Sequence, residues 1–78
     1  MTAAVRWRDD AAAVLAVLAH TGMPFTVDDL TTLAGKPPHY RQIGAAFAAA
    51  QRQRLIEAVG ATVGEGNRLV RVWVRCHR

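Results

Sequence analysis

The sequence predicts a small α+β domain in which three helices precede a β-hairpin. Apolar residues recur at helical spacing in the first half of the chain, whereas apolar and polar residues alternate strictly near its C-terminal end. A glycine-rich stretch, residues 64–67, separates the two candidate strands of the hairpin. Because 78 residues are too few to bury a second hydrophobic core, we expect a single domain over residues 1–78.

The first helix is indicated by an apolar stripe that ends shortly before Gly22. Asp9 and Asp10 suit the positive N-terminal end of a helix dipole, and Gly22 is a typical C-terminal stop. We expect residues 1–6 to form a flexible N-terminal arm. The stripe consists of Trp7, Ala11, Val14, Leu15 and Leu18.

A short second helix is predicted over residues 27–34. Thr26 and Asp29 have the spacing of a capping box at its start, and Gly35 follows its end. The inward face of this helix is expected to carry Val27, Leu30 and Leu33.

The third helix is predicted to begin at residue 38 or 39 and to end at residue 53. A proline in its first turn costs nothing, because that N–H would be unpaired anyway. Gly44 lies inside the helix at a cost of about 1 kcal/mol relative to alanine, and we expect close packing against another helix as the reason. The inward stripe is Ile43, Ala46, Phe47 and Ala50, and the opposite face carries Arg41, Ala45, Ala48 and Arg52.

The hairpin is predicted from strands over residues 58–63 and 69–76, with Arg68 at its tip. In the second strand, three valines alternate with larger polar or aromatic side chains, which is typical of a strand. These are Val70, Val72 and Val74 on one face, and Arg71, Trp73 and Arg75 on the other. Three helices, a short turn between the last two, and a following hairpin form the order of a winged helix-turn-helix, in which the hairpin is the wing.

The charge is divided unevenly along the chain. The net charge is +4 overall, but residues 1–35 carry −2 and residues 36–78 carry +6. A positive field on one half of a small protein favours a polyanionic partner, with nucleic acid as the first candidate. A merely solubilising basic surface is the alternative.

Several classes of function are not predicted. The residues that ligate metals, among them His20, His39, Cys76 and His77, show no zinc-site spacing. No glycine-rich phosphate loop is present, and the pair Asp28 and Asp29 is explained by helix capping. The sequence therefore predicts neither an enzyme nor a cofactor.

The sequence also favours the cytoplasm. The single cysteine cannot form an internal disulfide, which suits a reducing compartment. The N-terminal residues lack the apolar stretch of a signal peptide. The longest apolar run, residues 11–19, is too short to span a bilayer.

Three segments carry a resemblance to a known family. They are PFTVDDL at 24–30, HYRQIGAAF at 39–47 and VRVW at 70–73. In that order they resemble small winged helix-turn-helix DNA-binding proteins of actinobacteria and their phages. The resemblance implies a DNA-associated module in the cytoplasm of a bacterium or a phage-infected host, either a transcription regulator or a replication accessory. This chain has Tyr40 and Arg41 where the family has Pro-Asn, and Arg54 where a helix-ending glycine is usual.

The candidate DNA contacts come from the third helix and the wing. In this fold the start of the third helix enters the major groove, where Arg41 would pair with guanine. Wing arginines would reach a phosphate or the minor groove. The full set is Lys36, His39, Tyr40, Arg41, Gln42, Arg52, Arg68, Arg71 and Arg75.

Two further expectations concern protein partners. One recognition helix buries little surface on DNA, so a homodimer on a palindromic site is expected. Alternatively, the domain is a protein-interaction adaptor, such as a phage protein that docks on a host protein, with Leu69 and Trp73 as contacts. For Trp73 three roles are open: stacking with arginines, covering the core, or anchoring a partner.

Overall fold

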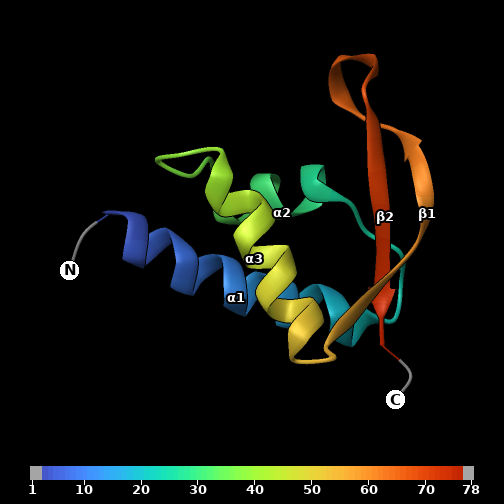
Figure 1. Cartoon of the computed structure of the whole chain (residues 1–78), viewed down its shortest axis with the longest axis horizontal. Coiled ribbons are helices and arrows are strands. Elements are labelled where there is room, and N and C mark those ends of the chain that lie inside the picture. Colours follow the sequence, from blue (N-terminus) through green and yellow to red (C-terminus); the bar gives the residue numbers. More distant parts are fainter. Residues whose placement is uncertain (1–2, 77–78) are drawn as a thin grey trace.

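The computed structural model describes residues 3–76 and is an α+β fold of three helices followed by a two-stranded antiparallel hairpin (Figure 1). The predicted order of elements is confirmed. None of the described helices is long and apolar enough to cross a membrane. The elements are α1 (Ala3–Thr21), α2 (Val27–Ala34), α3 (Arg41–Arg52), β1 (Ile56–Val63), the short 3-10 turn η1 (Glu65–Asn67) and β2 (Leu69–Arg75).

α1 is longer than expected and packs against both other helices. The backbone is already helical at Ala3, where alanines favour the helix, so residues 3–6 of the expected arm belong to α1. Residues 1–2 of that arm and His77 lie outside the described residues. The inward stripe repeats every four residues as Trp7, Ala11, Leu15 and Ala19, with Val14 and Leu18 half-buried beside it.

α2 has the predicted bounds and the predicted cap. The Asp28 N–H donates to Thr26 Oγ1 at 3.3 Å, and the Thr26 N–H donates to Asp29 Oδ2 at 2.9 Å. Leu30 is fully buried, but the prediction for Leu33 is wrong, because that side chain is 60% exposed. At 100° per residue, Leu33 lies about 90° from the middle of the arc that Val27, Leu30 and Ala34 turn inward.

α3 begins later than predicted and carries the expected faces. Residues 39–40 form a tighter turn before the α-helix starts at Arg41, because the Gln42 and Ile43 N–H groups donate to the His39 and Tyr40 carbonyls three residues back, at 3.0 and 3.1 Å. Ala46, Phe47 and Ala50 are buried, and Ile43 is packed against the core. The opposite face is exposed at Arg41, Ala45, Ala48 and Arg52.

The end of α3 adopts a glycine-type cap without a glycine. Arg54 has a φ of 59°, in the left-handed region. The Leu55 N–H donates to the Ala50 carbonyl and the Arg54 N–H to the Gln51 carbonyl, both at 3.0 Å, which is the Schellman arrangement. The backbone thus has the geometry that a helix-ending glycine would provide, and Arg54 adopts it with conformational strain.

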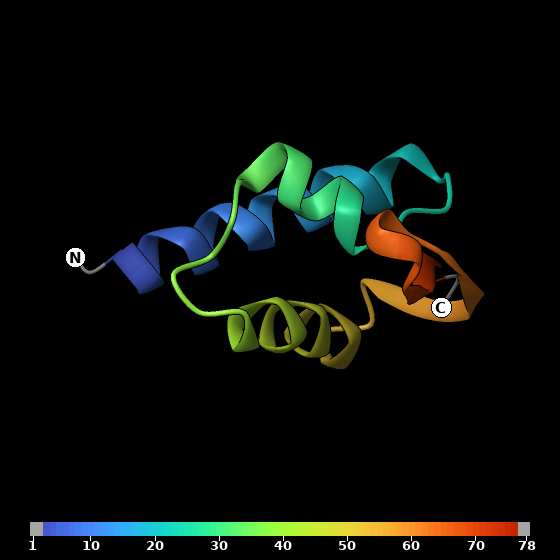
Figure 2. The same cartoon turned by 90° about the horizontal axis from the view of Figure 1, so that it is seen from above.

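The hairpin is attached to the helices through Phe25 and Trp73. The Phe25 N–H donates to the Trp73 carbonyl at 2.9 Å, and the Trp73 N–H donates to the Phe25 carbonyl at 2.8 Å. The Trp73 ring stacks on Phe47 of α3 at 5.1 Å between centroids, and Phe47 stacks on Phe25 at 6.4 Å. Trp73 is only 7% exposed, so it covers the core. Seen from above, the hairpin closes one end of the helical layer (Figure 2).

Replacing Arg54 with glycine should stabilise the fold. We expect Arg54→Gly to raise the free energy of unfolding by about 1 kcal/mol, since glycine adopts the left-handed region without a Cβ penalty. Urea unfolding followed by circular dichroism measures the change. Arg52→Gly, in the ordinary last turn of α3, is the control and should lose about 1 kcal/mol. A loss in both variants would contradict the strain at Arg54.

Candidate nucleic-acid interface

The loop between α2 and α3 and the tip of the hairpin meet at one hollow. Its volume is about 420 Å³. Lys36 from the loop, Tyr40 just before α3 and Arg68 from the hairpin all line it, together with the acidic Asp28. Three of the predicted contact residues, distant in sequence, are therefore close together.

Lys36 is held in place by an anchored turn. Gly35 has a φ of 82°, which disfavours any residue with a side chain, and its N–H donates to the Thr31 carbonyl at 2.9 Å. The Trp7 indole Nε1–H donates to the Gly35 carbonyl at 2.8 Å. Because this bond joins α1 to the residue before Lys36, the core of the protein sets where the loop leaves α2.

Arg68 is placed by close contact between the hairpin and α2. A Cβ on Gly64 would lie 2.8 Å from Asp28 Oδ2 and 3.0 Å from the methyl carbons of Val70. The Gly64 N–H also donates to the Arg68 carbonyl at 2.7 Å, which closes the tip. Because Gly64 has no side chain, the hairpin packs closely against the first turn of α2. Arg68 then lines the same hollow as Tyr40.

The residues at the start of α3 differ in what they can offer. Tyr40 is 78% exposed, and His39 and Arg41 are also exposed. Gln42 is half-buried, and its Oε1 accepts the His39 N–H at 3.4 Å. The Gln42 amide therefore supports the beginning of the helix, whereas the neighbouring side chains project into solvent.

The remaining predicted contacts are spread further apart. Arg52 is exposed at the far end of α3, about 16 Å along the helix axis from Arg41. Arg71 lies over the Trp73 ring, with its guanidinium carbon 5.9 Å from the ring centroid, an arrangement that suits a cation–π contact. Arg75 is exposed where β2 pairs with the beginning of β1.

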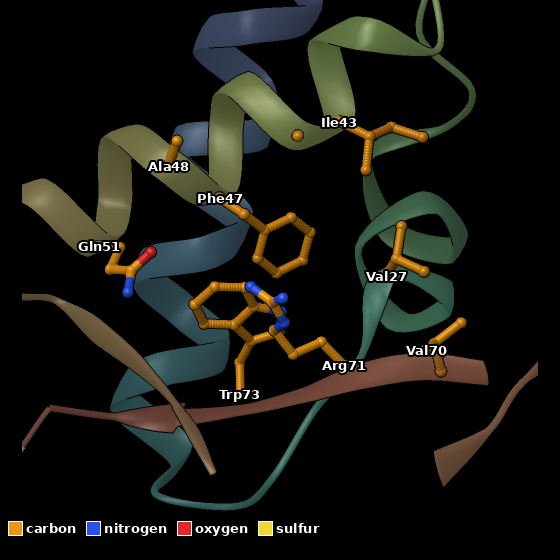
Figure 3. A pocket seen from close by; sticks show the side chains of 9 residues that line it. Val27, Ile43, Phe47, Ala48, Gln51, Val70, Arg71 and Trp73 are labelled. Carbon is orange, nitrogen blue, oxygen red and sulfur yellow. The ribbon is translucent and has the colours of Figure 1, made fainter. Parts of the chain in front are cut away.

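Sequence reasoning missed a groove between α3 and β2. It has a volume of about 370 Å³ and continues from the hollow that holds Tyr40 and Arg68. Figure 3 shows Phe47 and Trp73 facing each other, with Val27, Ile43 and Val70 beside them. Strict alternation predicted that Val70 and Trp73 lie on opposite faces, yet both line this groove, as does Arg71, because the groove runs along the edge of β2 away from β1, where side chains from both faces reach.

Gly44 lies on the wall of this groove, with open space where a side chain would be. A Cβ at Gly44 would have no atom within 4 Å. The expectation that Gly44 packs closely against another helix is therefore wrong. Gly44, which is unfavourable inside a helix, was the one feature of the sequence that could have indicated this groove.

Comparison of the chain with protein-family models, with curated proteins and with solved structures gives no match. Function is consequently inferred from the geometry of the described residues. That geometry offers an exposed α3, a cationic cluster at its start, and a groove with apolar walls beside it.

Replacing Gly44 with alanine should stabilise the protein. The new methyl group enters open space, so we expect a gain of about 1 kcal/mol in the free energy of unfolding from helix propensity alone. Thermal and urea unfolding measure it. The matched control is Gly64→Ala, whose methyl group would collide with Asp28 and Val70 and should cost about 1 kcal/mol or more. If Gly44→Ala destabilises the fold, the open space at this position is contradicted.

Proposed function

We propose that this chain is a winged helix-turn-helix protein that binds double-stranded DNA. The observation that carries the proposal is the shared hollow of Lys36, Tyr40 and Arg68, which brings the start of α3 and the hairpin tip to one cationic place. In this proposal α3 enters the major groove, and the hairpin lies on the backbone or in the minor groove.

The arrangement of elements supports the winged-helix assignment. α2, the loop and α3 form the helix-turn-helix unit, and β1 and β2 form the wing. The backbone pair between Phe25 and Trp73 joins the wing to the link between α1 and α2.

The exposed face of α3 suits a helix that approaches bases closely. Arg41 and Arg52 lie at its two ends, and the small side chains of Ala45 and Ala48 lie between them. Small residues let the helix backbone approach base edges, and an arginine near the start of the helix can pair bidentately with guanine. Tyr40 and Gln42 flank Arg41 as further contacts.

The phosphate contacts are assigned to the loop and the wing. Lys36 and His39 precede α3, where backbone N–H groups and the helix dipole also favour a phosphate. Arg68, Arg71 and Arg75 provide positive charge along the second strand. These contacts position the protein on the duplex without reading its sequence.

The biological setting follows as part of the same proposal. A single recognition helix buries little surface on DNA, so two copies on a palindromic site would supply the required affinity. The role is that of a small transcription regulator or a replication accessory in the cytoplasm of a bacterium or a phage-infected host.

Arg41→Ala should reduce sequence preference. We expect binding to the preferred duplex to weaken by about 1–3 kcal/mol, because a bidentate contact to guanine is lost, while binding to random duplex changes much less. Random-duplex selection defines the preferred site, and fluorescence anisotropy measures both affinities. Arg6→Ala, which removes an exposed arginine from α1, should leave both affinities unchanged. Equal losses on both duplexes would make Arg41 a phosphate contact only.

Arg68→Ala should weaken binding to every duplex alike. Removing one phosphate contact should lower the slope of log affinity against log salt concentration by about 1. Anisotropy titrations over a range of salt concentrations measure the slope for wild type and variant. Failure of the wild-type chain to bind any duplex at micromolar concentration in low salt would overturn the DNA proposal itself.

A further inference from the structure

The hollows between α3 and the hairpin adjoin one another and form one groove. The α3–hairpin groove is defined here as the surface from Lys36 and Arg68 at one end to Gln51 at the other. Val27 and Ile43 line all the neighbouring hollows and Val70 lines two of them, so the walls between α3 and β2 are mostly apolar, whereas the end at Lys36 and Arg68 is polar. Phe47 and Trp73 lie beneath them as part of the core.

Among the described residues, no side chain fills the groove beside Gly44. A Cβ there would meet nothing within 4 Å, and the next turn of α3 presents only the exposed Ala48. At the end near the hairpin tip, Tyr40 and Leu69 are 78% and 76% exposed. The unfilled space beside Gly44 and the exposed side chains of Tyr40 and Leu69 suit the apolar side chains of a partner.

The charges at the groove indicate the sign of the partner. Lys36 and Arg68 lie at one end, and Arg71 lies along β2. One acid, Asp28, shares their end, with its carboxylate directed at Gly64 of the hairpin. Positive charges outnumber negative ones along the described walls, so an acidic partner is complementary to them.

The shape of the groove indicates a helix. The lining on the α3 side runs from Tyr40, just before the helix, to Gln51, and extends about 16 Å, which is the length of three helical turns. Short amphipathic helices bind in such grooves through apolar side chains at i, i+3 or i+4, and i+7. DNA interfaces are more polar and more strongly charged than these walls.

We propose that the α3–hairpin groove binds an amphipathic helix of a protein partner. The helix has about three turns, its apolar side faces Val27, Ile43 and Val70, and its acidic end lies at Lys36 and Arg68. Gly44 and Ala48 allow the two helices to approach closely. This site borders the exposed face of α3 at Ala48, and it shares Lys36, Tyr40, Arg68 and Arg71 with the proposed DNA contacts. If the DNA proposal holds, the bound helix and the duplex therefore exclude each other.

The experiment selects peptides on the full chain without DNA. A displayed library of random peptides of about fourteen residues, enough for three helical turns with their ends, is selected on the wild-type protein. We expect the enriched peptides to be acidic, with apolar residues at helical spacing. They should bind Gly44→Leu at least tenfold more weakly, since leucine would occupy the groove.

Matched variants separate the groove from general effects. Gly60→Leu adds the same side chain on β1, where a Cβ also has nothing within 4 Å, and should bind the peptides as wild type does. Lys36→Gln with Arg68→Gln should weaken binding of the acidic peptides. Unfolding curves confirm that each variant is folded, and Gly44→Leu should be at least as stable as wild type because its side chain enters open space.

Four results would overturn the proposal. The first is that the Gly44→Leu substitution weakens the binding of none of the enriched peptides. The second is that the enriched peptides are neutral or basic. The third is self-association of the wild-type chain, measured by sedimentation, that Gly44→Leu abolishes, which would assign the groove to a second copy. The fourth is loss of duplex binding in Gly44→Leu without any enriched peptide, which would assign it to a DNA strand. Failure of wild type to bind DNA leaves the peptide result intact, so the two proposals fail separately.

Discussion

The contact of Trp73 with Phe25 and Phe47 joins the hairpin to the helices. Its backbone pairs with Phe25 in both directions, and its ring stacks on Phe47 of α3. β1 and β2 otherwise contact each other far more than they contact the helices. The direction in which the hairpin leaves the helices and the depth of the α3–hairpin groove therefore depend on this tryptophan. Burying its ring also stabilises a chain whose short length permits only a small core.

Two other contacts position the cations of the surface relative to the core. The hydrogen bond from Trp7 to the Gly35 carbonyl holds the loop that carries Lys36, and the approach of Gly64 to Asp28 holds the hairpin tip that carries Arg68. Neither contact involves a residue that we assign to DNA binding. Both set the distance between Lys36 and Arg68, two cations that are 32 positions apart in the sequence (68 − 36).

Two residues, one inside α3 and one just after its end, are locally unfavourable. Arg54 occupies a left-handed conformation just after the C-terminal end of α3, and Gly44 lies in the helix interior with open space beside it. Proteins often retain such unfavourable positions where function needs them. The proposed helix partner explains why position 44 is a glycine, because a side chain there would fill the groove. Nothing in the structure explains the arginine at position 54.

The sequence by itself determined the elements, because local chemistry controls them. Helical spacing located α1 and the faces of α3, the Thr26 and Asp29 pair located α2 to the residue, and alternation located β2. Three predictions failed: the burial of Leu33, the first residue of α3 and the close packing of Gly44. All three depend on how short helices rotate and pack against their neighbours, which the periodicity of the sequence does not define. Only the tertiary structure decided that Lys36, Tyr40 and Arg68 line one hollow, and that Val70 and Trp73 line the same groove. The physical reason is that the Phe25–Trp73 backbone pair and the stacking of Trp73 on Phe47 orient the hairpin relative to α3, and neither contact is encoded in the spacing of residues along one segment.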